Sequence, residues 1–261
     1  MQHIFSPTGQ ARLADTMRAK PLLVFDFDGT LAPIVARPDY ARVTPGVATR
    51  LAALAQRLPL AIVSGREAAD VRRRLHFSPR YVVGSHGADS PIWPDERPWT
   101  SALEPARAWL ASHRDALDEL GVRIEDKRFS VALHYRLAPD RALAQRRLRQ
   151  LLATLPDGLQ VFGGKQVFNI VADSAPDKAD AVKALALHAG CTTVFFVGDD
   201  VNDEPVFAEA AAHWLTIKVG RDSPPSQARF FLDSSAEMAL LLERMLRLLD
   251  AQNIACADSS R

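Results

Sequence analysis

Two aspartates separated by one residue, Asp26 and Asp28, end an apolar run that begins at Leu22, and Gly29 follows them directly. At a strand end both carboxylates can face the same crevice, and the glycine lets the backbone turn sharply. Carboxylates this close repel each other, and a bound cation removes the repulsion. Oxygen ligands without His or Cys nearby favour a hard ion such as Mg²⁺. The alternatives are an ordinary Asp-Gly turn or a calcium loop, although the later acidic spacing of a calcium loop does not follow.

A second acidic segment, residues 198–204, follows another apolar run and reads Gly-Asp-Asp-Val-Asn-Asp-Glu. It returns Asp203 four positions after Asp199, across a predicted turn from a strand into a helix. An acidic helix start is favourable in itself, which accounts for Asp203 but not for Asp199 directly after an apolar strand. The segment therefore repeats the arrangement of Asp26 and Asp28 at another strand end.

A hydroxyl and a lysine complete the polar groups at these strand ends. Ser64 and Gly65 close the apolar run that begins at Leu58, and a hydroxyl with backbone N–H groups at a helix start suits an anion. The alternative is a plain helix cap. Lys178 opens a predicted helix after a cap at Asp177, where the helix dipole disfavours a cation. A lysine at such a position is consistent with one held by an anion, but from this position alone a solvated surface lysine is the preferred interpretation.

Five apolar runs, ended by small or acidic residues, are the elements that must position these groups. Their hydrophobicity is continuous rather than alternating, as strands buried on both faces of a parallel sheet require. Helical segments lie between them, and this alternation is typical of a doubly wound α/β fold, in which ligands bind beyond the carboxyl ends of the strands. The runs are residues 21–30, 58–66, 81–87, 193–200 and 215–220, and the helical segments are 45–57, 66–75 and 177–189.

The stretch from about residue 91 to about residue 172 has a different pattern and predicts a small α+β unit inserted between the third and fourth strands. It combines helical segments, a period-two alternation and a hairpin around a Gly-Gly-Lys turn. We predict a core of residues 1–92 and 173–261 and an inserted unit of residues 93–172. The further predicted elements are a helix at 102–120, a strand at 129–136, a helix at 140–155, a hairpin of 159–162 and 166–171, an apolar helix at 231–249 and a polar tail.

The composition describes an ordinary globular protein. Of the 261 residues, 48% are hydrophobic and 24% are charged, and the 32 basic and 31 acidic side chains give a net charge of +1. A nucleic-acid or acidic-membrane partner would favour a basic excess, so we expect neither. Two cysteines cannot form a disulfide framework or a zinc cluster, and no apolar run is long enough for a membrane span or a signal peptide. We expect a cytoplasmic protein that acts as a monomer.

These motifs, in this order, resemble those of the haloacid dehalogenase (HAD) superfamily of phosphotransferases. The resemblance rests on Asp26-Phe27-Asp28-Gly29-Thr30-Leu31, Ser64-Gly65-Arg66, Lys178 and Gly198-Asp199-x-x-x-Asp203. It implies a Rossmann-like HAD core with a parallel sheet, a small inserted α+β cap and a two-step phosphoryl transfer. The roles that it implies are Asp26 as nucleophile, Asp28 as general acid and base, Ser64, Gly65 and Lys178 as phosphate-binding residues, and Asp26, Asp28, Asp199 and Asp203 as ligands of Mg²⁺.

A narrower resemblance is to the trehalose-6-phosphate phosphatases. It rests on residues 28–35, Ser85-His86-Gly87-Ala88, the cap segments 125–127 and 130–136, and the acidic segment 198–204. It implies hydrolysis of trehalose 6-phosphate, a small-molecule sugar phosphate, through an aspartyl-phosphate. The cap and hinge residues expected to bind the substrate are Arg66, His86, Glu125, Lys127, Ser130, His134, Arg136, Lys165 and Asn169.

The chain departs from the family pattern at two positions, Asn202 where Thr is usual and Asn169 where a Glu reaches the sugar hydroxyls. Asparagine forms hydrogen bonds but lacks the charge and length of glutamate, so a phosphatase acting on another sugar phosphate is the alternative. A catalytically inactive sugar-phosphate sensor is a second alternative, but it would be expected to have lost Asp26, Asp28 or Asp203. A mutase or a P-type transporter is excluded by the chain length, the cap and the lack of membrane spans.

Overall fold

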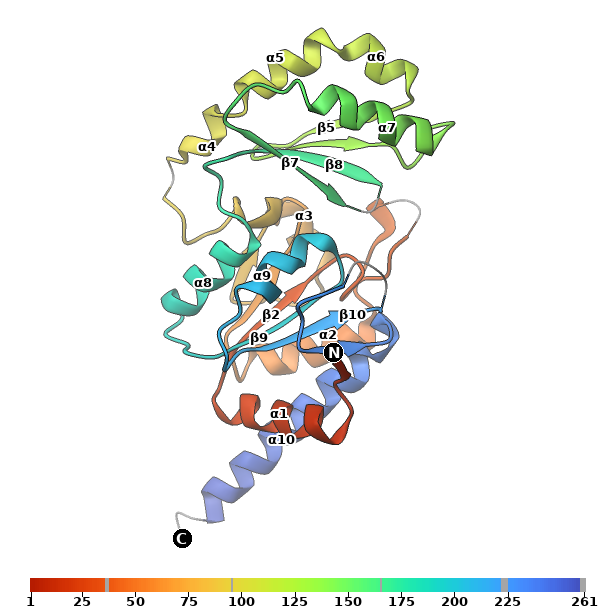
Figure 1. Ribbon diagram of the computed structural model, residues 1–261. Helices are drawn as coiled ribbons and strands as arrows, with labels where there is room; N and C mark the ends of the chain where they lie inside the picture. Colours follow the sequence, from red (N-terminus) through yellow and green to blue (C-terminus); the bar gives the residue numbers. More distant parts are fainter. Residues whose placement is uncertain (36–37, 95, 165, 222–224, 259–261) are drawn as a thin grey trace. The chain divides into compact units, whose positions relative to one another are not determined.

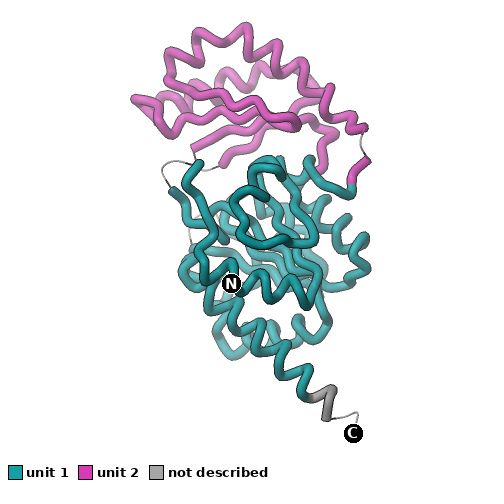
Figure 2. The backbone as a smooth tube through the Cα atoms, turned by 180° about the vertical axis from the view of Figure 1, so that it is seen from behind, with its two compact units in different colours: residues 1–92, 177–261 teal, residues 93–176 magenta. Residues whose placement is uncertain are grey.

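The computed structural model describes residues 1–35, 38–94, 96–164, 166–221 and 225–258. By its contacts the chain divides into two compact units, Met1–Ile92 with Asp177–Arg261, and Trp93–Pro176, coloured teal and magenta in Figure 2. The sequence placed the boundaries after residues 92 and 172, whereas the contacts place the second one after Pro176.

A sheet forms the centre of the first unit, and its strands β2, β9 and β10 are labelled in Figure 1. It has seven strands, in the order β1-β11-β10-β9-β2-β3-β4. Neighbouring strands pair in parallel throughout, which confirms the predicted α/β class. All residues of β2 and of β9 are buried, as their continuous apolar sequence predicts. The strands are β1 Gln2–His3, β2 Leu22–Asp26, β3 Leu60–Val63, β4 Tyr81–Val83, β9 Val194–Gly198, β10 Leu215–Val219 and β11 Phe230–Leu232.

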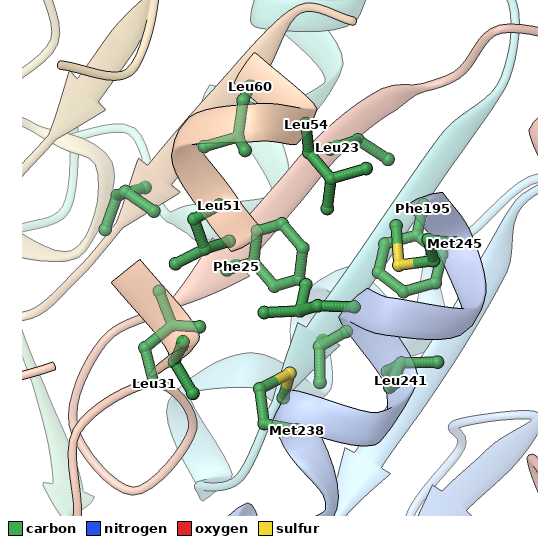
Figure 3. Packing of buried hydrophobic residues seen from close by; sticks show 14 of the residues in the cluster. Leu23, Phe25, Leu31, Leu51, Leu54, Leu60, Phe195, Met238, Leu241 and Met245 are labelled. Carbon is green, nitrogen blue, oxygen red and sulfur yellow. The ribbon is translucent and has the colours of Figure 1, made fainter. Parts of the chain in front are cut away.

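Helices cover both faces of this sheet. Phe25 of β2 packs in one core with Leu51 of α2 and Leu241 of α10, as Figure 3 shows. Side chains alternate along β9, and on the opposite face Phe196 meets Phe207 of α9 with ring centroids 5.5 Å apart. The helices of this unit are α1 Pro7–Arg18, α2 Pro45–Ala55, α3 Ala68–Arg74, α8 Lys178–His188, α9 Glu204–Ala208 and α10 Met238–Asp258.

The second unit has a four-stranded antiparallel sheet in the order β5-β6-β8-β7. Its hydrophobic core joins Val131 and Leu133 of β6 to Trp109 of α5, Leu117 of α6 and Leu148 of α7. The elements are α4 Pro98–Ser101, α5 Glu104–Ser112, α6 Arg114–Glu119, β5 Arg123–Asp126, β6 Val131–His134, α7 Arg141–Leu152, β7 Leu159–Gly164 and β8 Val167–Ala172.

The single helix predicted for residues 102–120 is interrupted at His113, between α5 and α6. The His113 ring stacks on Trp109 with centroids 4.3 Å apart, and its Nδ1 lies 2.8 Å from the Trp109 carbonyl oxygen. The backbone N–H of His113 bonds instead to the carbonyl of Leu110, three residues back. A side chain has therefore replaced one bond of the helix, which a periodicity analysis does not detect.

The end of the chain also differs from the prediction. A helix is predicted for residues 231–249, but its first two residues belong to the short strand β11, and α10 starts only at Met238. α10 then continues to Asp258, through much of the predicted polar tail. The sequence did not predict β1 or α1 either. Among the helices of the described residues, none combines the length and the apolar character that crossing a bilayer requires.

Candidate active site

The carboxyl ends of three neighbouring strands carry the polar residues that the sequence singled out. β2 lies between β9 and β3 in the sheet, and the three strands run in the same direction. Asp26 is the last residue of β2, Ser64 directly follows β3, and Asp199 directly follows β9. The structure thus brings these side chains to the edge of the sheet at which doubly wound folds bind their ligands.

Lys178 lies within hydrogen-bond distance of two aspartates. Its Nζ is 2.6 Å from Asp26 Oδ1 and 2.7 Å from Asp203 Oδ1, and the lysine side chain is 3% exposed. Lys178 is the first residue of α8, after the capping box that Asp177 forms with Asp180. A helix start is unfavourable for a cation, and these two carboxylates are the anions that hold it there.

Asp203 reaches back across its own turn. Its Oδ2 accepts hydrogen bonds from the N–H groups of Asp199 and Asp200, at 2.9 and 3.0 Å, while its Oδ1 faces Lys178. Asp203 is fully buried, and a Cβ at Gly198 would lie 2.4 Å from its carboxyl carbon, so the glycine leaves the space that this side chain fills. Both oxygens of Asp203 are engaged, and they fix the turn that carries Asp199.

Asp26, Asp199 and Asp203 form a group that fits a divalent metal ion. One carboxylate oxygen of each lies within 4.8 Å of the others, and all three residues are buried. When ionised, the three carboxylates and the Lys178 ammonium carry a charge of −3 + 1 = −2. A hard divalent cation balances this charge, and carboxylate oxygens are its preferred ligands. Asp26 and Asp199 are suited to hold the ion directly, with Asp203 behind them.

The crowding of charges also shows in the pKa values. Burial raises the pKa of Asp26 well above its usual value, and the charges of Asp203 and Asp199 raise it further. The charge of Lys178 lowers this pKa but offsets only part of the increase. Burial would lower the pKa of Lys178, but the carboxylates of Asp203 and Asp26 outweigh it and raise that pKa. Lys178 is therefore a fixed cation, and a metal ion would favour the charged form of Asp26.

Gly29 and Thr30, in the loop after β2, set the position of Asp199. The φ of Gly29 is +88°, and a Cβ at this position would lie 1.9 Å from Asp199 Oδ2. Thr30 is fully buried, and its Oγ1 lies 3.4 Å from Asp199 Oδ1. The turn that the Asp-Gly pair predicts therefore also makes room for a carboxylate from a distant strand.

Replacing Gly29 with alanine is expected to displace the Asp199 carboxylate. We expect kcat to fall about 100-fold, since displacements of about 1 Å have effects of this size. The matched control is Gly158→Ala, because Gly158 has a φ of +83° with no atom within 4 Å of the added Cβ. Both variants share the backbone strain, of about 1–2 kcal/mol. Equal losses of kcat in the two, measured by phosphate release, would contradict the role given to Gly29.

Asp28 is held by Arg66. The Nε and Nη2 of Arg66 donate to Asp28 Oδ2 and Oδ1 at 2.6 and 2.8 Å, and its Nη1 donates to Asp70 Oδ2 at 3.1 Å. A planar guanidinium in this geometry fixes the direction of the carboxylate. Among the described residues, the Asp28 side chain is not a member of the three-carboxylate group. Arg66, which is expected to bind the substrate, contacts Asp28.

The Arg66–Asp28 pair is supported from α3 by Asp70, and this support is expected to depend on pH. Burial alone would raise the pKa of Asp70, but hydrogen bonds from Arg74 and Arg66 outweigh it and lower the pKa to about 2. A lowered pKa means that the stabilisation is complete above the unfolded value of 3.8 and is lost as the pH falls toward 2. Asp70→Asn should lower the free energy of unfolding by about 2 kcal/mol at pH 7. Urea unfolding at pH 7, 5 and 3 tests this, and a difference from wild type that does not shrink at pH 3 would contradict it.

Ser64 and Gly65 lie at the turn between β3 and α3. Ser64 is 1% exposed, and its Oγ accepts a hydrogen bond from the Arg66 N–H at 3.2 Å. α3 begins only at Ala68, so Ser64 is not the cap of that helix. A Cβ at Gly65 would lie 2.4 Å from Cε1 of His86. His86, expected to bind the substrate, thus packs against this turn.

Three of the residues expected to bind the sugar meet on the sheet of the second unit. His134 Nε2 lies 2.8 Å and Lys127 Nζ 3.5 Å from the same oxygen of Glu125. The hydrogen bond from His134 and the charge of Lys127 outweigh burial and lower the pKa of Glu125 to about 2. Glu125 is therefore a carboxylate at neutral pH, a strong acceptor for hydroxyl groups.

The other residues expected to bind the sugar differ from one another in burial and in contacts. Ser130 is fully buried, and its Oγ has no hydrogen-bond partner among the described residues. Asn169 of β8 is 3% exposed and lies opposite Ala132 of β6. Arg136 follows β6 and is half-buried. Lys165 lies outside the described residues.

Two residues that support the site, Asp70 and Thr30, have no role predicted from the sequence. Asp70 precedes Arg74 by four positions on α3, and this spacing on one helix face is the signal that could have identified Asp70. Thr30 offers no comparable signal, because its partner Asp199 lies far away in the sequence.

One further group of possible metal ligands occurs among the described residues, His3, Asp233 and Glu237. The His3 Nε2 lies 3.3 Å from Glu237 Oε2 and 3.7 Å from Asp233 Oδ2. The His3 Nδ1 accepts the N–H of Phe5 at 3.2 Å, and this hydrogen bond favours the tautomer in which Nε2, the nitrogen facing both carboxylates, is the donor. This group joins the first strand to the start of α10 as a hydrogen-bonded cluster.

Comparison with known proteins agrees with this geometry. The family model for trehalose-phosphatases matches residues 24–236. The chain is 34% identical over 247 residues to a trehalose-phosphate phosphatase of Mycobacterium ulcerans, covering 87% of this chain and 61% of the relative. It is 36% identical over 206 residues to an uncharacterised glycosyl hydrolase of Mycobacterium tuberculosis, covering 72% of this chain and 15% of the relative. The chain thus spans less than two thirds of the length of these relatives.

Solved structures similar to this chain include that of a trehalose-6-phosphate phosphatase related protein, which is 25% identical in sequence. The TM-score is 0.69, and the match covers 88% of this chain and 99% of the related protein. The parallel core with its inserted antiparallel unit confirms the expected HAD fold. The family match covers most of the chain and includes every strand end that carries the site. The chain therefore belongs to the trehalose-phosphatase family.

Proposed function

We propose that the protein is a magnesium-dependent phosphatase that hydrolyses trehalose 6-phosphate to trehalose and phosphate. The observation that carries this proposal is the buried group of Asp26, Asp199 and Asp203 around Lys178. Ligands that are all oxygen favour Mg²⁺, which keeps several waters and binds substrate phosphates. When bound, the ion supplies positive charge to the oxygens of the phosphoryl group.

Asp26 is the nucleophile of the first half of the reaction. One of its oxygens forms a bond to phosphorus while the bond between phosphorus and the sugar oxygen breaks, which gives an aspartyl-phosphate. Lys178 holds Asp26 Oδ1 at 2.6 Å and so keeps the carboxylate in place. Asp28 donates a proton to the leaving sugar oxygen. A protonated Asp28 retains an oxygen acceptor for Arg66, so the guanidinium continues to orient it.

Asp28 acts as the base in the second half. Its carboxylate accepts a proton from water as the water oxygen bonds to phosphorus, and the bond between phosphorus and Asp26 breaks. Phosphate leaves, and both aspartates return to their starting states. In both halves the Ser64 hydroxyl, the Gly65 N–H and Lys178 stabilise charge on the phosphoryl oxygens. The Ser64 Oγ already accepts the Arg66 N–H, which orients its hydroxyl.

The choice of sugar is assigned to the second unit, proposed to be the cap. Glu125, Lys127 and His134 form a charged polar group that suits sugar hydroxyls. Trehalose 6-phosphate is favoured because the family match includes both the core and this unit, and because the M. ulcerans relative bears that activity in its name. Asn169 favours the second candidate, a phosphatase for another sugar phosphate, since an amide replaces a carboxylate there.

Phosphate release from a panel of sugar phosphates tests this proposal. With Mg²⁺ present, kcat/KM for trehalose 6-phosphate should exceed that for glucose 6-phosphate, sucrose 6-phosphate and mannosyl analogues by about 100-fold or more, the size of difference that hydroxyl recognition gives. Chelation of the metal should abolish turnover, and added Mg²⁺ should restore it. Equal or faster turnover of another sugar phosphate would contradict trehalose 6-phosphate as the substrate. Absence of turnover with every sugar phosphate of the panel would contradict the phosphatase activity.

A further inference from the structure

A short segment after β4, residues 84–89, packs against the turn between β3 and α3, and we call it the brace. An antiparallel bridge joins its ends, with the Gly84 N–H 2.8 Å from the Asp89 carbonyl oxygen. Within it, Ser85 and His86 both have positive φ, 48° and 58°. Two successive non-glycine residues in this region are strained, and such strain persists only where the surrounding structure imposes it.

The brace is bonded to the turn on both sides of Gly65. The N–H of His86 donates to the carbonyl of Ser64 at 3.0 Å, and the N–H of Ser85 donates to the carbonyl of Arg66 at 2.7 Å. The positive φ of both residues is what directs these two successive N–H groups toward the turn. The strained conformation of Ser85 and His86 therefore allows both N–H groups to hold the backbone of residues 64–66.

The His86 ring fills the space beside Gly65. A Cβ at Gly65 would lie 2.4, 2.7 and 3.1 Å from Cε1, Nε2 and Nδ1 of the ring. Further along, Asp89 Oδ2 accepts the N–H of Ala68, the first residue of α3, at 3.0 Å. The turn cannot move toward the brace without contact with the ring, and it cannot move away without loss of these hydrogen bonds.

We infer that the brace, through the His86 ring, sets the position of the Ser64 hydroxyl and the Gly65 N–H at the phosphoryl group. His86 is then a positioning residue of the phosphate site and not a contact of the sugar. The inference rests on the proposed function in one respect, that this turn is the phosphate site. It requires that loss of the ring weakens all phosphate ligands by a similar factor, whatever alcohol they carry.

Three variants test this inference: His86→Gly, which removes the ring and suits the positive φ, Gly65→Ala, and the two combined. The readouts are the Kd of inorganic phosphate by calorimetry with saturating Mg²⁺, and kcat/KM for trehalose 6-phosphate and for 4-nitrophenyl phosphate. We expect His86→Gly to raise the phosphate Kd about tenfold and to lower both kcat/KM values by one factor. Gly65→Ala should raise the phosphate Kd more than His86→Gly does. The double variant should bind phosphate more tightly than Gly65→Ala, because the added Cβ has room once the ring is absent.

Two controls separate these effects from general ones. His76 is exposed, so His76→Ala removes an imidazole without touching the turn. Gly46→Ala adds a Cβ whose nearest neighbour, Arg50 Nη1, is 3.5 Å away. Both controls should leave the phosphate Kd and both kcat/KM values unchanged. A change in either control equal to that in the brace variants would overturn the inference.

The remaining outcomes are equally decisive. If His86→Gly leaves the phosphate Kd unchanged and raises only the KM for trehalose 6-phosphate, His86 is a sugar contact and the inference is wrong. If the double variant binds phosphate no better than Gly65→Ala, the ring does not set the turn. The wild-type protein could bind phosphate more tightly than His86→Gly and yet fail to turn over trehalose 6-phosphate. That result would support the role of the brace and contradict the proposed substrate. Wild-type protein that binds no phosphate with Mg²⁺ would overturn both.

Discussion

Replacing Asp26 with asparagine is expected to abolish turnover while the protein stays folded. An amide cannot form the bond to phosphorus, so kcat should fall by at least about 10⁴-fold, as for the loss of other catalytic nucleophiles. Asp26 is buried beside Asp203 and Asp199, and burial raises its pKa above the unfolded value. A raised pKa means that its charged form lowers stability at neutral pH in metal-free protein. The neutral asparagine should therefore give a metal-free melting temperature at least equal to that of wild type.

The control for this prediction is Asp15→Asn, a change of the same chemistry at an exposed position on α1. It should leave kcat and the melting temperature unchanged. Acid-quenched wild-type protein should also carry a phosphoryl group on the peptide with Asp26 during turnover, and Asp26→Asn should not. Retained turnover in Asp26→Asn, or a phosphoryl group on another residue, would rule out Asp26 as the nucleophile.

Replacing Lys178 with methionine is expected to reduce both activity and stability. The substitution leaves Asp26 and Asp203 buried without the cation that both contact. Removing one partner of a buried charge pair costs about 3–5 kcal/mol, and losing one positive group at a transferred phosphoryl lowers kcat about 10²–10³-fold. Without Lys178 the pKa of Asp26 rises further, so the loss of stability should shrink as the pH falls from 7 to 5.

Lys183→Met is the matched control on the same helix. Lys183 is exposed and pairs with Glu209 at the surface, and such pairs contribute at most about 1 kcal/mol. Urea unfolding of both variants at pH 7 and pH 5 gives the comparison. Similar losses in the two variants, or a Lys178→Met loss that grows toward pH 5, would contradict the account of Lys178 as the counter-ion of the cluster.

The parts of the fold that depend on continuous apolar sequence could be predicted. β2 and β9 are buried on both faces, and their sequence alone identifies them as strands of a parallel sheet with Asp26 and Asp199 near their ends. The three residues of β11 pair with β10 and β1, and so short a strand depends on its neighbours rather than on its own pattern. The break at His113 depends on one side chain competing for a carbonyl, which hydrophobic periodicity does not encode.

For the candidate site, the sequence predicts which residues gather but not which contact which. Lys178 contacts Asp26 and Asp203, a pairing that only the folded chain shows. Arg66 holds Asp28 because the turn after β3 brings its guanidinium to that carboxylate, a contact that the sequence did not predict. Such pairings join residues far apart in the sequence, and a single sequence contains no record of them.

Titration with Mg²⁺ by calorimetry tests the central claim most directly, that one divalent ion is held by the carboxylates at the ends of β2 and β9. Wild-type protein should bind one ion, and Asp199→Asn should weaken that binding at least about tenfold, as loss of a ligating group does. Asp233→Asn, in the hydrogen-bonded cluster with His3, should leave the affinity unchanged. Undiminished Mg²⁺ binding by Asp199→Asn, or binding that is lost in Asp233→Asn, would contradict the account.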